Sequence, residues 1–65
     1  MSNEVKVHGK WRYMLDCEDY AVVNIFVDEN QNTVVCAHSL DTGYYDQWYL
    51  HAFYRDFTFM SEESL

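Results

Sequence analysis

An alternating pattern near the N-terminus is the feature that most limits what this chain can fold into. From Val5 to Leu15 every odd position is apolar or glycine, and the even positions up to Arg12 are polar or charged. A period of two over this length is typical of a half-buried β-strand, and Gly9 favours a bend or bulge within it. The sequence therefore predicts a strand over residues 5–15 with a basic outward face (Lys6, His8, Lys10 and Arg12).

Two further segments have the composition of strands. Residues 20–27 and 33–38 are rich in β-branched and aromatic side chains, and the five polar residues between them form a turn. Such a pair predicts an antiparallel hairpin, and its nearly continuous apolar character places it near the centre of the sheet. Strict alternation along the first of these strands predicts that one set of side chains (Val22, Asn24 and Phe26) faces opposite to another (Ala21, Val23 and Ile25).

Residues 44–54 show the spacing of a helix. At 100° per residue their apolar side chains form one stripe (Tyr44, Tyr45, Trp48, Tyr49 and Ala52). Asp41 and Thr42 are the best-placed N-terminal caps, and Arg55 would enter the stripe if the helix continued, so we expect it to end near Tyr54. Phe57 and Phe59 then predict a short closing strand, followed by a frayed acidic tail over residues 61–65.

These segments predict a single small domain over residues 1–65. Its fold class is α+β, with the order β-β-β-α-β and one helix packed on one face of a small antiparallel sheet. A chain of 65 residues buries only about 60% of the surface its unfolded form exposes, so its twelve aromatic side chains must supply most of the core. An all-β alternative would treat residues 41–43 as another hairpin loop.

The N-terminus and the cysteines indicate the class of protein. No basic stretch followed by an apolar run resembles a secretory signal, and no apolar segment approaches the length of a membrane span. Cys17 and Cys36 are too few for a disulfide framework, and we interpret them as reduced thiols, although a single bridge between them stays open. We expect a cytoplasmic protein, and the initial methionine favours a complete small gene product.

No motif predicts catalysis. Residues 41–43 match the Asp-Thr-Gly tripeptide of aspartic proteases, but the chain is too short even for half of such an enzyme, and a turn or cap explains them better. Cys36 and His38 are the only closely spaced zinc-ligand types, and on a strand they stand about 6.6 Å apart. A buried cysteine beside a hydrogen-bonded histidine is the simpler interpretation. We therefore expect no enzyme activity, no metal and no cofactor.

Negative charge dominates the rest of the chain. The net charge is −7, and ten of the eleven carboxylates lie at or beyond Asp16. A field of that sign attracts basic partners and repels nucleic acid and anionic membranes. The basic strand face could contact phosphates, but a solvated face whose lysines protect a sheet edge fits better. We expect this face to point away from any basic partner.

The acidic residues supply most of the candidate binding residues. If the first turn is extended, Asp16 and Glu18 stand about 6.6 Å apart, close to two phosphate steps of about 3.4 Å along a DNA strand. The acids could alternatively serve only to keep a tyrosine-rich protein soluble. Leu50 and Tyr54, near Asp46, could form an exposed patch of the kind that anchors a protein interface. Alternatively, they belong to the peripheral core. The predicted partner-binding residues are Asp16, Glu18, Asp19, Asp28, Glu29, Asp46, Leu50 and Tyr54.

A short, acidic, cysteine-poor and aromatic-rich chain without a catalytic motif resembles phage-encoded inhibitors of host defence, in particular small anti-CRISPR proteins and other nucleic-acid mimics. The resemblance covers the chain as a type and rests on composition. It implies a stoichiometric inhibitor, monomeric or weakly dimeric, that occupies the basic nucleic-acid-binding surface of a host complex. The alternative is a structural or assembly module that self-associates through its aromatic helix or a strand edge.

Overall fold

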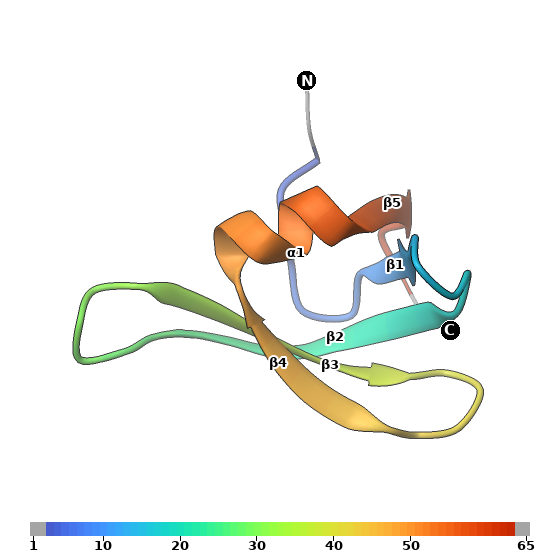
Figure 1. The fold of residues 1–65 in the computed structure, drawn as a ribbon, viewed down its shortest axis with the longest axis horizontal. Helices are drawn as coiled ribbons and strands as arrows, with labels where there is room; N and C mark the ends of the chain where they lie inside the picture. The colour runs from blue at the N-terminus through green and yellow to red at the C-terminus, as the bar shows by residue number, and fades with distance from the viewer. Residues whose placement is uncertain (1–2, 64–65) are drawn as a thin grey trace.

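Five antiparallel strands form one sheet, and a single short helix covers one of its faces (Figure 1). The computed structural model describes residues 3–63. Across the sheet the strand order is β4-β3-β2-β1-β5. The predicted α+β class with one helix on an antiparallel sheet is confirmed, with one strand more than expected. The elements are β1 (Lys10–Tyr13), β2 (Asp19–Val27), β3 (Thr33–Ser39), β4 (Tyr45–Tyr49), α1 (Leu50–Asp56) and β5 (Phe57–Ser61).

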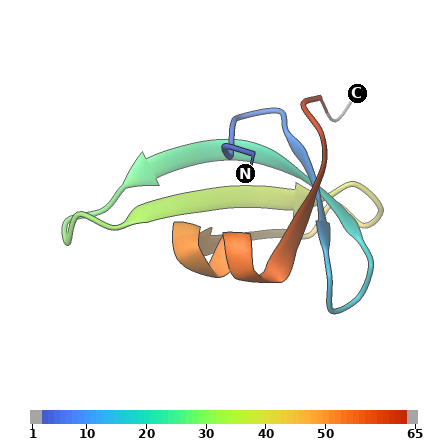
Figure 2. The same cartoon turned by 90° about the horizontal axis from the view of Figure 1, so that it is seen from above.

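The core lies between α1 and the sheet face that it covers (Figure 2). Phe53 is fully buried and stacks on Phe57 with ring centroids 4.1 Å apart. Trp11 meets Phe53 edge-on at 5.2 Å, and Val22 and Val35 close the cluster from the central strands. Offset and edge-to-face ring pairs add to the gain from apolar burial, so large rings compensate for the small size of the domain.

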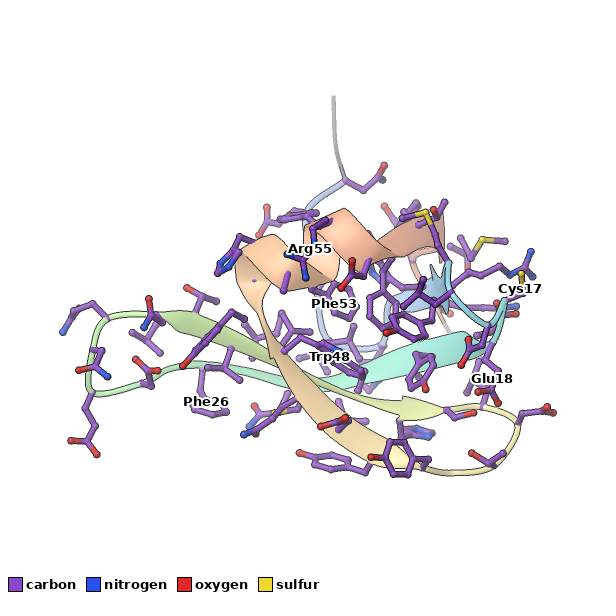
Figure 3. All side chains as sticks on the ribbon, in the orientation of Figure 1. Cys17, Glu18, Phe26, Trp48, Phe53 and Arg55 are labelled. Atoms are coloured by element: carbon purple, nitrogen blue, oxygen red, sulfur yellow. The ribbon has the colours of Figure 1, made fainter. Side chains whose placement is uncertain are left out.

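The β2–β3 hairpin agrees with its prediction except in the facing of its side chains. Its strands occupy interior positions of the sheet, as predicted. A bulge between Val22 and Asn24 inserts one residue into β2. As a result, Val22 and Ile25 both pack on the core, while Phe26 lies on the side away from α1 (Figure 3). The predicted alternation is therefore wrong beyond Val22, because a bulge shifts the facing by one residue.

The first strand is much shorter than the alternation predicted. Only Lys10–Tyr13 forms β1, and a turn precedes it in which Gly9 donates its N–H to the Lys6 carbonyl. His8 has φ of 77°, a left-handed conformation that interrupts any strand. Val5 is nevertheless buried in the core, so the alternation correctly identified an inward-facing side chain without identifying a continuous strand.

The predicted helix over residues 44–54 is wrong in its first half. Tyr45–Tyr49 forms β4, which pairs with β3 in a register that sets Trp48 against Val35. The helix begins only at Leu50 and has no side-chain cap, so the predicted caps serve instead in the β3–β4 turn. The helical spacing of the aromatic residues also fits a strand that alternates between exposed and half-buried positions. Residues 45–49 form a strand and not a helix because they pair with the edge of β3 that β2 leaves free.

The C-terminal strand is longer than predicted. Residues 57–61 form β5, so Ser61 belongs to the sheet and not to a tail; the predicted tail beyond residue 63 lies outside the described residues. Strand β5 pairs with β1, which therefore sits between β5 and β2. The expectation that the basic face protects an edge is wrong, because β1 is an interior strand.

Candidate acidic binding site

The turn between β1 and β2 is compact. The Asp16 Oδ1 atom accepts the N–H of Glu18 at 2.9 Å, and Cys17 between them adopts φ of 60°. Short polar side chains stabilise such turns by bonding to the backbone two residues ahead. The segment is therefore not extended, and the predicted match of the spacing of Asp16 and Glu18 to two phosphate steps is wrong.

A second turn, between β3 and β4, lies beside the first. The hydroxyl of Ser39, which is 1% exposed, accepts the N–H groups of Asp41 and Thr42, both at 3.2 Å. The same hydroxyl lies 3.5 Å from the Glu18 Oε1 atom and donates to it. Ser39 therefore connects the two turns and brings Asp41 close to Glu18.

Three carboxylates gather where these turns meet: Asp16, Glu18 and Asp41, which we call the acidic cluster. A hydrogen bond with the Asp16 carboxyl, partial burial and the negative charges of Asp16 and Asp41 raise the pKa of Glu18 above its ordinary value, against a lowering by Ser39. Among residues 3–63, none of the ion pairs involves a member of this cluster. The like charges of these carboxylates therefore disfavour their simultaneous ionisation, and none of these ion pairs offsets that effect.

Asp19 behaves differently although it belongs to the same turn region. Its Oδ1 atom accepts the Arg12 Nε–H at 2.8 Å, and its Oδ2 atom lies 3.6 Å from the Lys10 Nζ atom. The hydrogen bond from Arg12 and both positive charges lower the pKa of Asp19. The basic face, which we expect to point away from any basic partner, therefore adjoins the acids of this turn through Lys10 and Arg12, and it neutralises Asp19. The hairpin register, which sets Arg12 opposite Asp19, is the reason.

An open hollow of about 500 Å³ lies between the two turns. A volume of this size is in the range of sites that accept a ligand or a large side chain. Carboxylates form most of its wall, Leu40 adds an apolar surface and Lys10 stands at its margin. The lining residues are Lys10, Asp16, Cys17, Glu18, Asp19, Leu40 and Asp41.

The second predicted acidic turn lies at the opposite end of the molecule. Asp28 and Glu29 are at the tip of the β2–β3 hairpin, far from the β1–β2 turn in both ribbon views (Figures 1 and 2). The Asp28 Oδ1 atom accepts the N–H groups of Asn30 and Asn32, both at 2.9 Å, so its first role is to shape the turn. The predicted acids therefore do not form one continuous surface.

The remaining predicted residues do not form an exposed patch. Leu50 and Tyr54 are half-buried and pack against the core, and the Tyr54 hydroxyl accepts the N–H of Val5 at 3.3 Å. They fit the alternative interpretation as peripheral core. Asp46 is half-buried in β4, where its carboxylate accepts the N–H of Gln47 at 2.8 Å.

Asp41 and Ser39 are the contributors to this site that sequence reasoning missed. Asp41 was expected to cap a helix, and Ser39 is an inconspicuous residue at a strand end. The one available signal was the all-β alternative, in which residues 41–43 form a hairpin loop. That interpretation places Asp41 at the same end of the sheet as the β1–β2 turn.

The cysteines and histidines do not assemble into a metal site in the described part of the chain. No group of three or more His, Cys, Asp or Glu side chains within residues 3–63 has the arrangement to hold a metal ion. Cys17 is exposed, whereas Cys36 is buried in β3, and the two are not bridged. No helix in the same range is long and apolar enough to cross a membrane.

Comparison with known proteins adds no relative. No family model matches the chain, and neither a curated protein nor a solved structure is significantly similar to it. The residues of the acidic cluster are therefore interpreted from their own geometry.

The Glu18→Gln substitution is expected to stabilise the fold at neutral pH. A carboxyl whose pKa is higher in the folded than in the unfolded chain favours folding while it is protonated and disfavours it once ionised. The stability that the protonated Glu18 contributes is therefore lost as pH rises through its pKa in the folded protein. Glutamine keeps an oxygen that can accept from Ser39. We expect the variant to melt at a higher temperature than the wild type at pH 7 and at an equal temperature below the ordinary glutamate pKa of about 4.3.

Melting curves followed by circular dichroism across this pH range measure the difference. Glu29→Gln is the matched control, because it removes an equal charge from the exposed hairpin tip. A Glu18→Gln advantage that persists unchanged in acid would contradict the role assigned to Glu18 ionisation.

Proposed function

We propose that this chain is a small acidic protein that binds and blocks the basic nucleic-acid-binding surface of a host complex, in the manner of an anti-CRISPR-type inhibitor. The observation that supports it is the acidic cluster, whose three carboxylates lie together and take part in none of the ion pairs among residues 3–63, in a protein of net charge −7. A cationic group of the partner offsets the like charges of these carboxylates, so binding is electrostatically favourable.

The arrangement suits an arginine or lysine side chain of the partner. The guanidinium of an arginine that enters the hollow forms charge-assisted hydrogen bonds with Glu18 and Asp41, while the methylene groups of the same arginine lie against Leu40. Arginines that normally contact phosphate present this chemistry. Competition with nucleic acid then follows from occupation of the same side chains and not from a copy of the phosphate spacing.

The charge distribution disfavours direct nucleic-acid binding. Two of the four basic residues, Lys10 and Arg12, are engaged with Asp19, and a third, Arg55, pairs with Asp56 at 3.0 Å. A strongly acidic protein with its cations so occupied gains little from displacing counterions on a phosphate backbone. Nucleic acid is therefore the expected competitor for the partner and not the ligand of this chain.

An affinity capture from the natural host tests the proposal. We expect the immobilised protein to retain a basic nucleic-acid-binding complex at low salt and to release it at high salt or with excess DNA. The double variant Glu18→Lys/Asp41→Lys is expected to bind at least about 100-fold more weakly, since it removes two charge-assisted hydrogen bonds of about 1.5–3 kcal/mol each.

The variant Glu62→Lys/Glu63→Lys is the matched control, because it makes the same change of net charge at exposed positions near the C-terminus. Its binding is expected to stay close to that of the wild type. Equal weakening in both double variants would reduce the interaction to net charge and reject the acidic cluster as the site. Capture of no basic nucleic-acid-binding protein would reject the proposed function itself.

A further inference from the structure

A second open hollow, of about 420 Å³, lies where the β2–β3 hairpin extends past the end of β4. Three of its residues form a row across the sheet, because the register pairs Phe26 with Val34 and Val34 with Tyr49. Directly opposed residues of antiparallel strands point to the same face of a sheet. Figure 3 shows Phe26 on the face away from α1, so the row lies on that face. Trp48 and Ala52 also line the hollow, where β4 ends and α1 begins.

The row sets a small side chain between two large rings. Val34 is 6% exposed, whereas Phe26 is 40% and Tyr49 48% exposed. Because β3 separates β2 from β4, the two rings start from backbones about 10 Å apart, which is two strand spacings. A flat group that contacts a ring on each side needs about 7–8 Å, which is twice the contact distance of two carbon atoms. The hollow therefore has room above Val34 for a planar group.

The charge of the hollow is negative. Among residues 3–63, Asp28 is the one charged residue that lines it, and it takes part in none of the ion pairs. The N–H groups of Asn30 and Asn32 both donate to the Asp28 Oδ1 atom, so these two bonds leave Oδ2 to another donor. Gln47 adds an amide oxygen, which accepts the Cys36 thiol at 3.7 Å. A carboxylate beside aromatic rings, with no lysine or arginine in the wall, favours a cation.

We propose that this hollow binds the guanidinium group of an arginine from a basic protein partner. A guanidinium is planar and weakly hydrated, and it stacks on aromatic rings. The rings of Phe26 and Tyr49 contact its faces, while Asp28 accepts hydrogen bonds from its edge. A lysine ammonium has no plane to place between two rings and is more strongly hydrated, so arginine is favoured. The identity of the partner as a host complex rests on the proposed function, whereas arginine binding at this hollow does not.

An NMR titration with N-acetyl-arginine amide tests the site without any host component. The titration is run at pH 8, where histidines carry little charge, because the ring of His51 stacks on Tyr49. We expect the amide signals of Val34 and Tyr49 to shift with a dissociation constant on the order of 1–10 mM. The citrulline analogue has a similar shape without the charge, and it is expected to bind at least about fivefold more weakly.

Three outcomes of the titration would overturn the proposal. Equal affinity for the arginine and citrulline probes would exclude a cation site. Equal affinity for N-acetyl-lysine amide would exclude the preference for a planar group. Shifts confined to the acidic cluster would place arginine binding at the other end of β3, beside Ser39.

Two substitutions test which groups hold the arginine. Asp28→Asn keeps the Oδ1 acceptor that shapes the turn but removes the charge, and it is expected to weaken binding about two- to fivefold. Glu29→Gln, which removes the neighbouring charge, is its control and should weaken binding less. Tyr49→Leu removes one ring and is also expected to cost about two- to fivefold in affinity.

Tyr45→Leu is the matched control for the ring, because Tyr45 is an exposed tyrosine of the same strand outside the hollow. Its affinity for the arginine probe is expected to equal that of the wild type. An equal loss in Tyr49→Leu and Tyr45→Leu, or no loss in Asp28→Asn, would overturn the hollow as the arginine site.

Discussion

The Phe53→Ala variant is expected to lose a large part of the free energy of unfolding at 25 °C. Phe53 is 0% exposed and contacts the rings of Trp11, Trp48 and Phe57. Truncating a buried phenylalanine costs about 3–5 kcal/mol, because apolar transfer is lost and a cavity remains. At about 0.05–0.15 kcal/mol per residue, this chain has a total stability of about 3–10 kcal/mol. One substitution therefore removes a large part of it.

Urea unfolding monitored by circular dichroism measures the loss. His51→Ala is the control within the same helix, since its side chain is exposed and such changes usually alter stability by less than about 0.5 kcal/mol. A Phe53→Ala variant that unfolds at nearly the wild-type urea concentration would mean that α1 does not anchor the core. The same result would also remove the main reason for a seven-residue helix without a side-chain cap to be stable.

The strands of the central hairpin were predictable because their composition and their turn agree. Residues 20–27 and 33–38 are β-branched and aromatic, and five polar residues connect them. The bulge beside Val22 was not predictable, because no residue there demands it and its position depends on the packing of Ile25 against the core. Local patterns therefore predicted the elements but not the facing of every side chain.

The helix over residues 44–54 was over-predicted because a stripe of aromatic side chains fits two structures. Spacing alone does not distinguish a helical face from a strand whose exposed members are tyrosines. What decides is non-local: β3 requires a partner along its second edge, and β4 supplies it from Tyr45 to Tyr49. A propensity argument sees only the residues of one segment, so it misses this requirement.

The candidate site shows the same division. The sequence identified the acids of the β1–β2 turn, but the pairing of Asp19 with Arg12 depends on a hairpin register that composition does not reveal. Asp41 lies close to Glu18 because Ser39 connects their two turns. Ser39 bonds to Glu18, which is 21 residues away in the sequence. The fold determines which charged residues lie together. A count of charges in the sequence therefore predicts the sign of a surface but not which residues form it.

Trp11 provides the second large expected effect. The side chain is 3% exposed and meets Phe53, Tyr54 and Phe59 edge-on at 5.2–5.9 Å. Its Nε1 is the one buried side-chain polar atom in residues 3–63 without a hydrogen-bond partner. A Cβ added at Gly9 would lie 3.2 Å from this nitrogen, so the glycine leaves room for the indole ring. Trp11 therefore contributes apolar contact while keeping an unsatisfied donor.

Trp11→Ala is expected to cost about 3–5 kcal/mol, a large part of the total stability, as for other buried large rings. Trp11→Phe is expected to cost clearly less than that. It retains an aromatic ring against Phe53, and it removes a buried N–H whose desolvation costs about 1–3 kcal/mol when no partner accepts it. The partial cavity and the relieved donor act in opposite directions in this variant.

Urea unfolding of the two variants separates these contributions. If the indole N–H has no acceptor, the Trp11→Phe loss should stay well under half of the Trp11→Ala loss. If the N–H is satisfied in solution, Trp11→Phe loses a hydrogen bond of about 0.5–1.5 kcal/mol in addition to ring volume, and the two losses approach each other. Since Gly9 adjoins the same nitrogen, Gly9→Ala in the Trp11→Phe background should cost less than in the wild type.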